Sequence, residues 1–238
     1  MKNLVAAMLL MALVAASVSC KKDVIGDGPV TTQTRTITSF TGIDLRMNGT
    51  VYYTNAADWK LEVVAKSSIH SMLETTIVDG RLLIRYTNGK TYDADETIRI
   101  NVSGPGINSL ETNTSGSIYC MNAMQPANLF VRTSGSGNIY LQSVTTNNIE
   151  AESTVSGHIT ASAGTANSEK IKTDGSGKVD LSAITAKNVT GRIIGSGDIK
   201  VKVTDHLDAT IDGSGSLYFS GAPLITTHIN GSGHLVRF

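Results

Sequence analysis

Residues 175–199 read GSGKVDLSAITAKNVTGRIIGSGDI, and this stretch contains two copies of one pattern, 20 residues apart. The pattern is a serine, a glycine, and an aliphatic residue two positions after the glycine. Seven copies occur, with their glycines 21, 20, 20, 20, 18 and 18 residues apart. A period near 20 residues indicates a solenoid or a similar array. The copies are Ser115-Gly116, Ser136-Gly137, Ser156-Gly157, Ser176-Gly177, Ser196-Gly197, Ser214-Gly215 and Ser232-Gly233.

Apolar residues alternate with other residues on both sides of each glycine. Val179 and Leu181 flank Asp180 after one glycine, and Leu207 and Ala209 alternate before another. A period of two is typical of half-buried strands, and no useful amphipathic helical window separates the copies. The sequence therefore predicts an all-β chain, a single-stranded parallel β-helix (β-solenoid) with rungs of ~20 residues. The motif serines and glycines are predicted to form a ladder along one corner.

The composition agrees with a narrow coil and excludes one class of function. Of 23 glycines, twelve lie in the seven corners, and aromatic residues make up only 5% of the chain. A thin interior accounts for the scarcity of large rings. Lysine and arginine number 20, as do aspartate and glutamate. This balance lacks the basic excess of an electrostatic nucleic-acid binder, so no nucleic-acid partner is expected.

Further motifs lie before and after the glycine copies. They are residues 40–45 (FTGIDL), 48–51 (NGTV), 79–84 (DGRLLI), 218–223 (YFSGAP) and the final GSG at 231–233. In combination they resemble the bacterial auto-transporter adhesin head domain of the GIN type, a domain of unknown function. The resemblance covers about residues 37–237. It implies a β-helix of the kind found in Bacteroidetes envelope lipoproteins. That family has no assigned catalytic residues, so none is carried over.

The first residues have the features of an export signal. Lys2 is followed by thirteen apolar residues, 4–16, which is fewer than the ~20 needed to span a bilayer. The segment from Ser17 to Cys20 resembles the lipobox of bacterial lipoproteins, in which the cysteine is lipidated and becomes the mature N-terminus. Ser17 stands where leucine is usual. The alternative is a simple signal peptide cleaved near Cys20.

These observations divide the chain into a lipoprotein signal peptide (1–19), a tether (20–34) and a β-solenoid domain (35–238). Within that domain, residues 103–238 hold the glycine repeats. The N-terminal part, 35–102, is predicted to be a β cap or to supply the first rungs, which protects an edge strand. Its Asp79-Gly80 pair predicts a hairpin and Asn88-Gly89 a turn. Residues 67–73 are predicted to form one helical turn.

Few residues point to chemistry. Cys120 lies in an apparent strand and is predicted to be a buried, inert thiol without a disulfide partner. His158 and His234 follow motif glycines, yet they are nearly four rungs apart and are expected to face solvent. Lys178 belongs to a corner that recurs without lysine, so it does not indicate a phosphate-binding loop. No metal and no cofactor is expected.

Two aspartates are the best candidates for catalysis. Asp174 and Asp212 both precede a Gly-Ser-Gly copy and lie two rungs, roughly 9–10 Å, apart. Inverting glycosidases hold their carboxylates about 6.5–9.5 Å apart. However, aspartate commonly precedes glycine in turns, and Ile194 takes the same position on the rung between. Calcium-binding β-rolls also contain Asp-Gly-Ser-Gly, but with a nine-residue period.

The sequence thus predicts a non-enzymatic, adhesin-like lipoprotein of the bacterial outer membrane. Lys21, which follows Cys20, differs from the aspartate that retains some lipoproteins at the inner membrane. Expected partners are the membrane, through the lipid anchor, and a glycan or an envelope or host surface protein. Two alternatives stay open, namely a polysaccharide-active enzyme and a structural protein of envelope assembly. Exposure of the domain at the cell surface is a further expectation.

Overall fold

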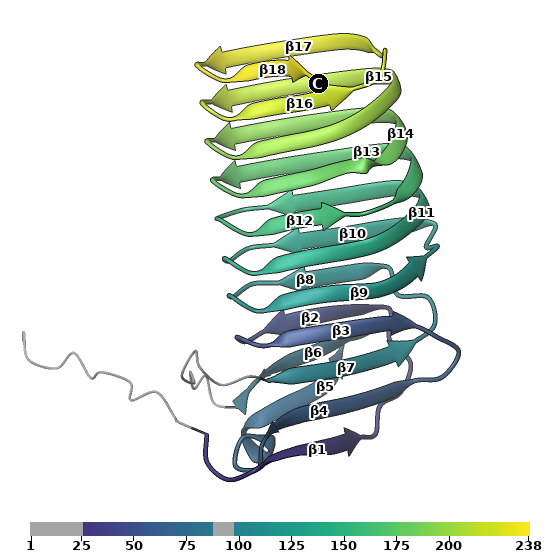
Figure 1. Cartoon of the computed structure of the whole chain (residues 1–238), viewed down its shortest axis with the longest axis vertical. Helices are drawn as coiled ribbons and strands as arrows, with labels where there is room; N and C mark the ends of the chain where they lie inside the picture. Colours follow the sequence, from purple (N-terminus) through teal and green to yellow (C-terminus); the bar gives the residue numbers. More distant parts are fainter. Residues whose placement is uncertain (1–25, 88–97) are drawn as a thin grey trace, which may run out of the picture.

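The structure, a computed structural model, describes residues 26–87 and 98–238 (Figure 1). The predicted signal peptide, Cys20 and the Asn88-Gly89 turn lie outside these residues. None of the helical structure in the two described ranges has the length and apolar character needed to cross a bilayer. Almost every element is a strand: β1 (Val30–Arg35), β2 (Gly42–Arg46), β3 (Thr50–Asn55), β4 (Lys60–Lys66), β5 (Leu73–Val78), β6 (Arg81–Tyr86), β7 (Arg99–Gly104), β8 (Ser109–Thr112), β9 (Ser117–Met124), β10 (Asn128–Thr133), β11 (Asn138–Ser153), β12 (His158–Ala161), β13 (Gly164–Gly175), β14 (Lys178–Gly195), β15 (Asp198–Gly213), β16 (Ser216–Ser220), β17 (Leu224–Gly231) and β18 (His234–Arg237).

The strands wind into a flattened parallel coil with two faces, which confirms the predicted β-solenoid. The second half of β11 pairs with β10 and β13, and its first half pairs with β9 and β12. One long strand therefore bends from one face to the other. Asn148 aligns with Ser168, and Ser168 with Asn188, so these turns of the coil are 20 residues long. The Ser-Gly motifs form the opposite corner (Figure 1).

The corners have glycine because the backbone of successive turns comes too close for a side chain. A Cβ added to Gly215 would overlap the carbonyl oxygen of Gly197 in the turn before. Gly195, the first glycine of its Gly-Ser-Gly copy, has a φ of +106°, a region that residues with side chains rarely adopt. Both reasons recur from turn to turn, so the glycine period follows from the stacking of the corners.

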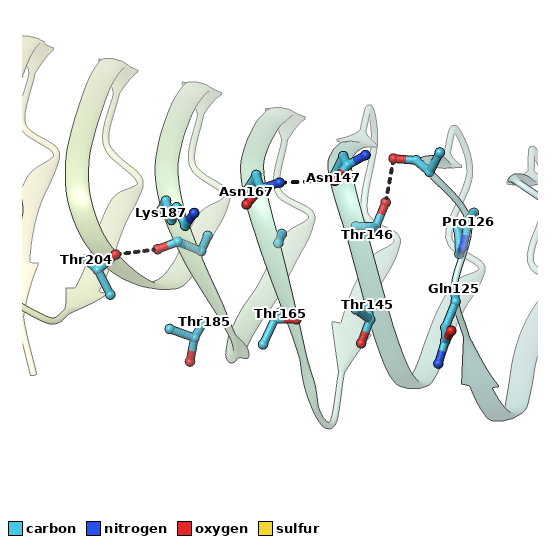
Figure 2. A pocket seen from close by; sticks show the side chains of 13 residues that line it. Gln125, Pro126, Thr145, Thr146, Asn147, Thr165, Asn167, Thr185, Lys187 and Thr204 are labelled. Atoms are coloured by element: carbon cyan, nitrogen blue, oxygen red, sulfur yellow. Dashed lines mark hydrogen bonds between the residues drawn. The ribbon is translucent and has the colours of Figure 1, made fainter.

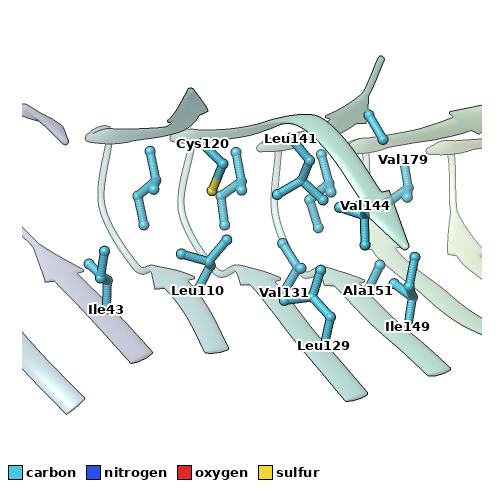
Figure 3. Packing of buried hydrophobic residues seen from close by; sticks show 14 of the residues in the cluster. Ile43, Leu110, Cys120, Leu129, Val131, Leu141, Val144, Ile149, Ala151 and Val179 are labelled. Atoms are coloured by element: carbon cyan, nitrogen blue, oxygen red, sulfur yellow. The ribbon is translucent and has the colours of Figure 1, made fainter. Parts of the chain in front are cut away.

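The core is a set of aliphatic ladders running along the coil axis. Alternate residues point inward on each face, as Lys178–Gly195 shows, where Val179 and Leu181 are buried before the bend and Ile184 and Ala186 after it. Equivalent residues stack on one another between turns, as Val131 does on Ala151 (Figure 3). Burying such side chains contributes about 1.5–3 kcal/mol each. The coil is therefore stabilised by many small contributions along its length.

The N-terminal part supplies both turns of the coil and its cap. β2 and β3 do not lie at the end; they insert between the turn of β6 and β7 and the turn of β8 and β9. Beyond them, β5 pairs antiparallel with β6, β4 pairs antiparallel with β7, and β1 covers β4. The order of turns in space therefore differs from their order in sequence, which the sequence did not predict (Figure 1).

Local predictions in this part are confirmed where the structure describes them. Asp79 and Gly80 both have positive φ and join β5 to β6 in a hairpin. A 3₁₀ turn, His70–Met72, lies within the predicted helical turn. Residues 30–34, assigned to the tether from sequence, form most of β1. Nearly all of β1 is exposed, and its sequence, VTTQTR, has no alternation of apolar and polar residues from which a strand could be predicted.

Candidate functional site: a polar groove along the bend

A groove of about 710 Å³ lies along the bend of the coil, on the side away from the glycine corners. This volume is within the range of small-molecule and cofactor sites. The groove crosses several turns, from Gln125 and Pro126 at one end to Thr204 at the other (Figure 2). It forms where β11, β13 and β14 pass from one face to the other. We call it the bend groove.

Two rows of polar side chains line the bend groove, one residue per turn. Thr145, Thr165 and Thr185 align with one another in register. The second row, two residues further along each strand, is Asn147, Asn167 and Lys187 (Figure 2). The Asn167 side-chain amide donates a hydrogen bond to the Asn147 side-chain oxygen at 3.0 Å. Successive turns stack about 4.8 Å apart, so the groove presents the same groups at a regular interval.

The chemistry of the bend groove is that of hydroxyl and amide groups. Lys187 is the one charged residue among those that line it. Threonine hydroxyls and asparagine amides both donate and accept hydrogen bonds, which suits a ligand rich in hydroxyls. In contrast, the Thr146 hydroxyl donates to the backbone oxygen of Ala127 at 3.0 Å, and the Thr204 hydroxyl donates to the Asp205 carboxylate at 2.6 Å, so both hydroxyl protons are engaged within the fold.

A second regular feature is a stack of three tyrosines on the outer surface of one face. The ring centroids of Tyr52 and Tyr119 are 5.4 Å apart, and those of Tyr119 and Tyr140 are 4.6 Å apart. The guanidinium of Arg99 lies over the Tyr52 ring. Both faces of the Tyr119 ring are therefore covered, and the Tyr52 ring lies between Tyr119 and Arg99, so a sugar cannot stack on either ring. We assign the tyrosines to the stability of the coil, at about 0.5–1.5 kcal/mol per pair.

The motif residues named from sequence lie along one corner. The seven motif glycines (116, 137, 157, 177, 197, 215 and 233) are buried. Six of the seven motif serines are exposed (Ser115, Ser136, Ser176, Ser196, Ser214 and Ser232), and Ser156 is half-buried. The hydroxyls of Ser156 and Ser176 approach to 3.4 Å. The corner is regular, and none of its motif residues lines the bend groove.

The candidate carboxylates share one row, as their spacing requires. Asp174 aligns with Ile194, and Ile194 with Asp212. Each aspartate has a basic neighbour on its own face: Lys172 lies 3.5 Å from Asp174 and Arg192 lies 3.1 Å from Asp212. Both carboxylates are therefore engaged in surface ion pairs, and the turn that contains Ile194 lies between them. This arrangement favours a structural role for the two aspartates in turns over a catalytic role.

The remaining candidate residues, Cys120, His158 and His234, do not line the bend groove. Cys120 is a free, buried thiol, and burial raises its pKa to about 12, so it is inert as predicted. His158 and His234 are exposed. Within the two ranges that the structure describes, no three histidine, cysteine, aspartate or glutamate side chains gather closely enough to hold a metal ion.

One unusual residue, Glu169, was missed from sequence. It is fully buried in the interior of the coil, in the aliphatic ladder between Ile149 and Val189. Neither of its carboxyl oxygens has a hydrogen-bond partner, and burial raises its pKa to about 8. The same turn has Ala161 at the position of Leu141, so a larger inward side chain accompanies a smaller one.

The threonine row of the bend groove and the inward position of Glu169 both have a signal in the sequence. Thr145, Thr165 and Thr185 recur at the 20-residue period of the corners. Glu169 stands two positions before Ile171 and 20 after Ile149, which places it inward. Comparing every position across turns, and not only the glycines, identifies the threonine row and the inward carboxylate.

Comparison with known proteins agrees with this architecture. Residues 39–223 match the model of the family described as "Putative auto-transporter adhesin, head GIN domain". The chain belongs to this family. The match covers both the interleaved N-terminal turns and most of the glycine repeats, and confirms the resemblance drawn from the sequence motifs. No curated protein matches the chain.

Solved structures share the fold of this GIN-domain chain. A putative adhesin from Bacteroides fragilis superposes with a TM-score of 0.85 at 23% identity, covering 90% of this chain and all of that one. A putative lipid binding protein from Parabacteroides distasonis gives 0.76 at 24% identity, covering 91% and 100%. A putative adhesin from Parabacteroides merdae gives 0.73 at 18% identity, covering 91% and 99%. At these identities the likeness shows the fold alone.

Proposed function

We propose that this chain is a non-enzymatic binding protein of the bacterial cell envelope, whose bend groove holds an extended glycan along the coil axis. The observation that carries the proposal is the double row of hydroxyl and amide groups, repeated at the spacing of the turns. An extended polymer with a regular series of hydroxyls could contact equivalent groups on successive turns. Membership of an adhesin-head family supports a binding role.

The lining of the bend groove also favours binding over catalysis. A hydrolase needs a paired acid and base, and the groove is lined by no carboxylate and no histidine. Several weak, equivalent contacts give an affinity that grows with the length of the ligand. Each neutral hydrogen bond contributes about 0.5–1.5 kcal/mol.

The groove is tested by removing one pair of amides. We expect Asn147→Ala/Asn167→Ala to weaken glycan binding at least about tenfold, because two sets of amide contacts are lost from adjacent turns. The measurement is binding of the purified full-length chain to a glycan array, followed by titration with the best glycan.

The chain offers a closely matched control. Asn128 and Asn148 are also exposed, one turn apart and hydrogen-bonded at 2.7 Å, but they lie outside the bend groove. The Asn128→Ala/Asn148→Ala variant should bind as the unmodified chain does. Equal losses in both variants, or an array without any bound glycan, would contradict the proposal.

We further propose that Cys20 carries a lipid and that residues after it hold the domain away from the membrane. The support is the sequence before Cys20, in which the apolar run of residues 4–16 is followed by small residues and then by the cysteine. Several acyl chains, each contributing about 0.8 kcal/mol per buried CH₂, would hold such a chain firmly in the outer membrane. Protease added to intact cells tests whether the domain is exposed at the surface.

Metabolic labelling with a clickable fatty acid tests the anchor. Label should appear on the unmodified chain in the membrane fraction and disappear in Cys20→Ala, which should leave that fraction. Cys120→Ala is the matched control, because it removes the other cysteine, which is buried. Label that persists in Cys20→Ala, or an unlabelled native chain, would support a simple signal peptide instead.

A further inference from the structure

The C-terminal turn of the coil is open at its end. β17 pairs with β15 and β18 with β16, each along one edge only among the residues described. All eight residues of β17 are exposed. Ile225 and Ile229 continue the ladders of Leu207 and Ile211, which are buried, yet they are 45% and 41% exposed. The apolar core of the coil therefore reaches solvent at this end.

The other end shows how this coil is covered. There the parallel turns finish under antiparallel strands, with β4 on β7 and β5 on β6 (Figure 1). Leu61 and Val63 of β4 are fully buried by this arrangement. The backbone of a parallel turn thus accepts an antiparallel strand as its last neighbour. Nothing within residues 98–238 does the same for β17 and β18.

The open edge also lacks the charges that usually protect an edge strand. β17 reads LITTHING and has no lysine, arginine, aspartate or glutamate. β18 adds a single charge, at Arg237. Natural edge strands commonly carry charges that repel a second edge. Here two copies could meet without like-charge repulsion along β17, and their exposed isoleucines would cover each other.

We propose that two copies of this chain join end to end through β17 and β18 about a two-fold axis. An axis normal to the two faces reverses the strand direction, so β17 would lie antiparallel to β17 of the second copy, and β18 to its equivalent. This is the same kind of pairing that closes the other end. A two-fold contact closes on itself, whereas a head-to-tail contact would continue into a filament.

Distances between spin labels on the full-length chain test the geometry. Thr226 and Thr190 lie in one outward row, two turns apart. In Thr226→Cys the two labels should lie close together. In Thr190→Cys they should lie about 19 Å further apart, since four extra turn spacings separate them. Both variants also carry Cys20→Ser, which removes the chain's other cysteine, and Cys120 is buried with a raised pKa, so it should not take up the label.

A second test of the proposal places a charge at the contact between the two copies. Thr227 aligns with the buried Ala209, and its side chain lies at the open end. Thr227→Lys, combined with each labelling site, should abolish the intermolecular distances because it buries two like charges together. Thr190→Lys, with the label at 226, is the matched control and should preserve them. Equal distances at the two labelling sites would indicate a head-to-tail contact and overturn the proposal, as would the absence of any intermolecular distance.

Discussion

Replacing Gly197 with alanine is expected to destabilise the coil by more than about 3 kcal/mol. The added methyl group would overlap the carbonyl oxygen of Gly177 in the preceding turn. That oxygen accepts a hydrogen bond of 3.2 Å from the backbone of Asp198, so it is not free to move aside. Urea unfolding followed by circular dichroism measures the loss. Hydrogen exchange would show whether unfolding begins at this corner.

Ser196→Ala is the control for this experiment, because its side chain is exposed at the same corner. Its free energy of unfolding should stay within about 0.5 kcal/mol of that of the unmodified chain. If Gly197→Ala lost less than about 1 kcal/mol, the turns would not be in the tight contact that the structure shows.

Replacing Glu169 with valine is expected to stabilise the coil by several kcal/mol at neutral and higher pH. Valine is the residue at the equivalent position of the following turn, Val189, and would complete the aliphatic ladder. The carboxyl of Glu169 is buried without a hydrogen-bond partner, an arrangement that costs free energy in either protonation state. Urea unfolding at several pH values measures the gain.

The raised pKa of Glu169 makes the stability of the coil depend on pH. The pKa of Glu169 is raised by burial from 4.5 to about 8, so the folded state keeps a proton that the unfolded state has already lost. The free energy of unfolding should therefore fall by about 1.4 kcal/mol per pH unit as the pH rises through that window. Below it this contribution is fully present, and above it the loss is complete.

Glu169→Gln separates charge from shape, because it should remove this slope while retaining a polar side chain of the same size. Glu150→Gln is the control, since Glu150 is partly exposed and paired with Lys170 at 2.6 Å. It should leave the slope in place. An unchanged slope in Glu169→Gln would show that the carboxyl is hydrated or paired in solution.

The repeated half of the fold was predictable because one constraint acts on each turn. A glycine recurs where backbones meet, and most inward residues, such as Val179, are apolar, so both periods appear in the sequence. The interleaving of β2 and β3 was not predictable. An alternating strand such as Thr50–Asn55 specifies an inward face, but it does not specify which strands will be its neighbours.

The candidate site was predictable only in part. The ladder of Thr145, Thr165 and Thr185 follows from the same period, but the hollow around it depends on how strongly the strands bend. Bend geometry comes from the packing of both faces and has no local signal. The spacing of Asp174 and Asp212 made them candidates for catalysis, but their ion pairs with Lys172 and Arg192 are visible only in the structure.

The insertion of β2 and β3 between later turns has a consequence for how the molecule can vary in length. Turns between Gly137 and Gly215 contact only their immediate neighbours, so gene duplication or deletion could add or remove about 20 residues there without changing the ends. The turn made by β2 and β3 is locked between two turns, that of β6 and β7 and that of β8 and β9, which both follow it in sequence. Evolution can therefore lengthen the rod in its second half, while its first half has to be inherited whole.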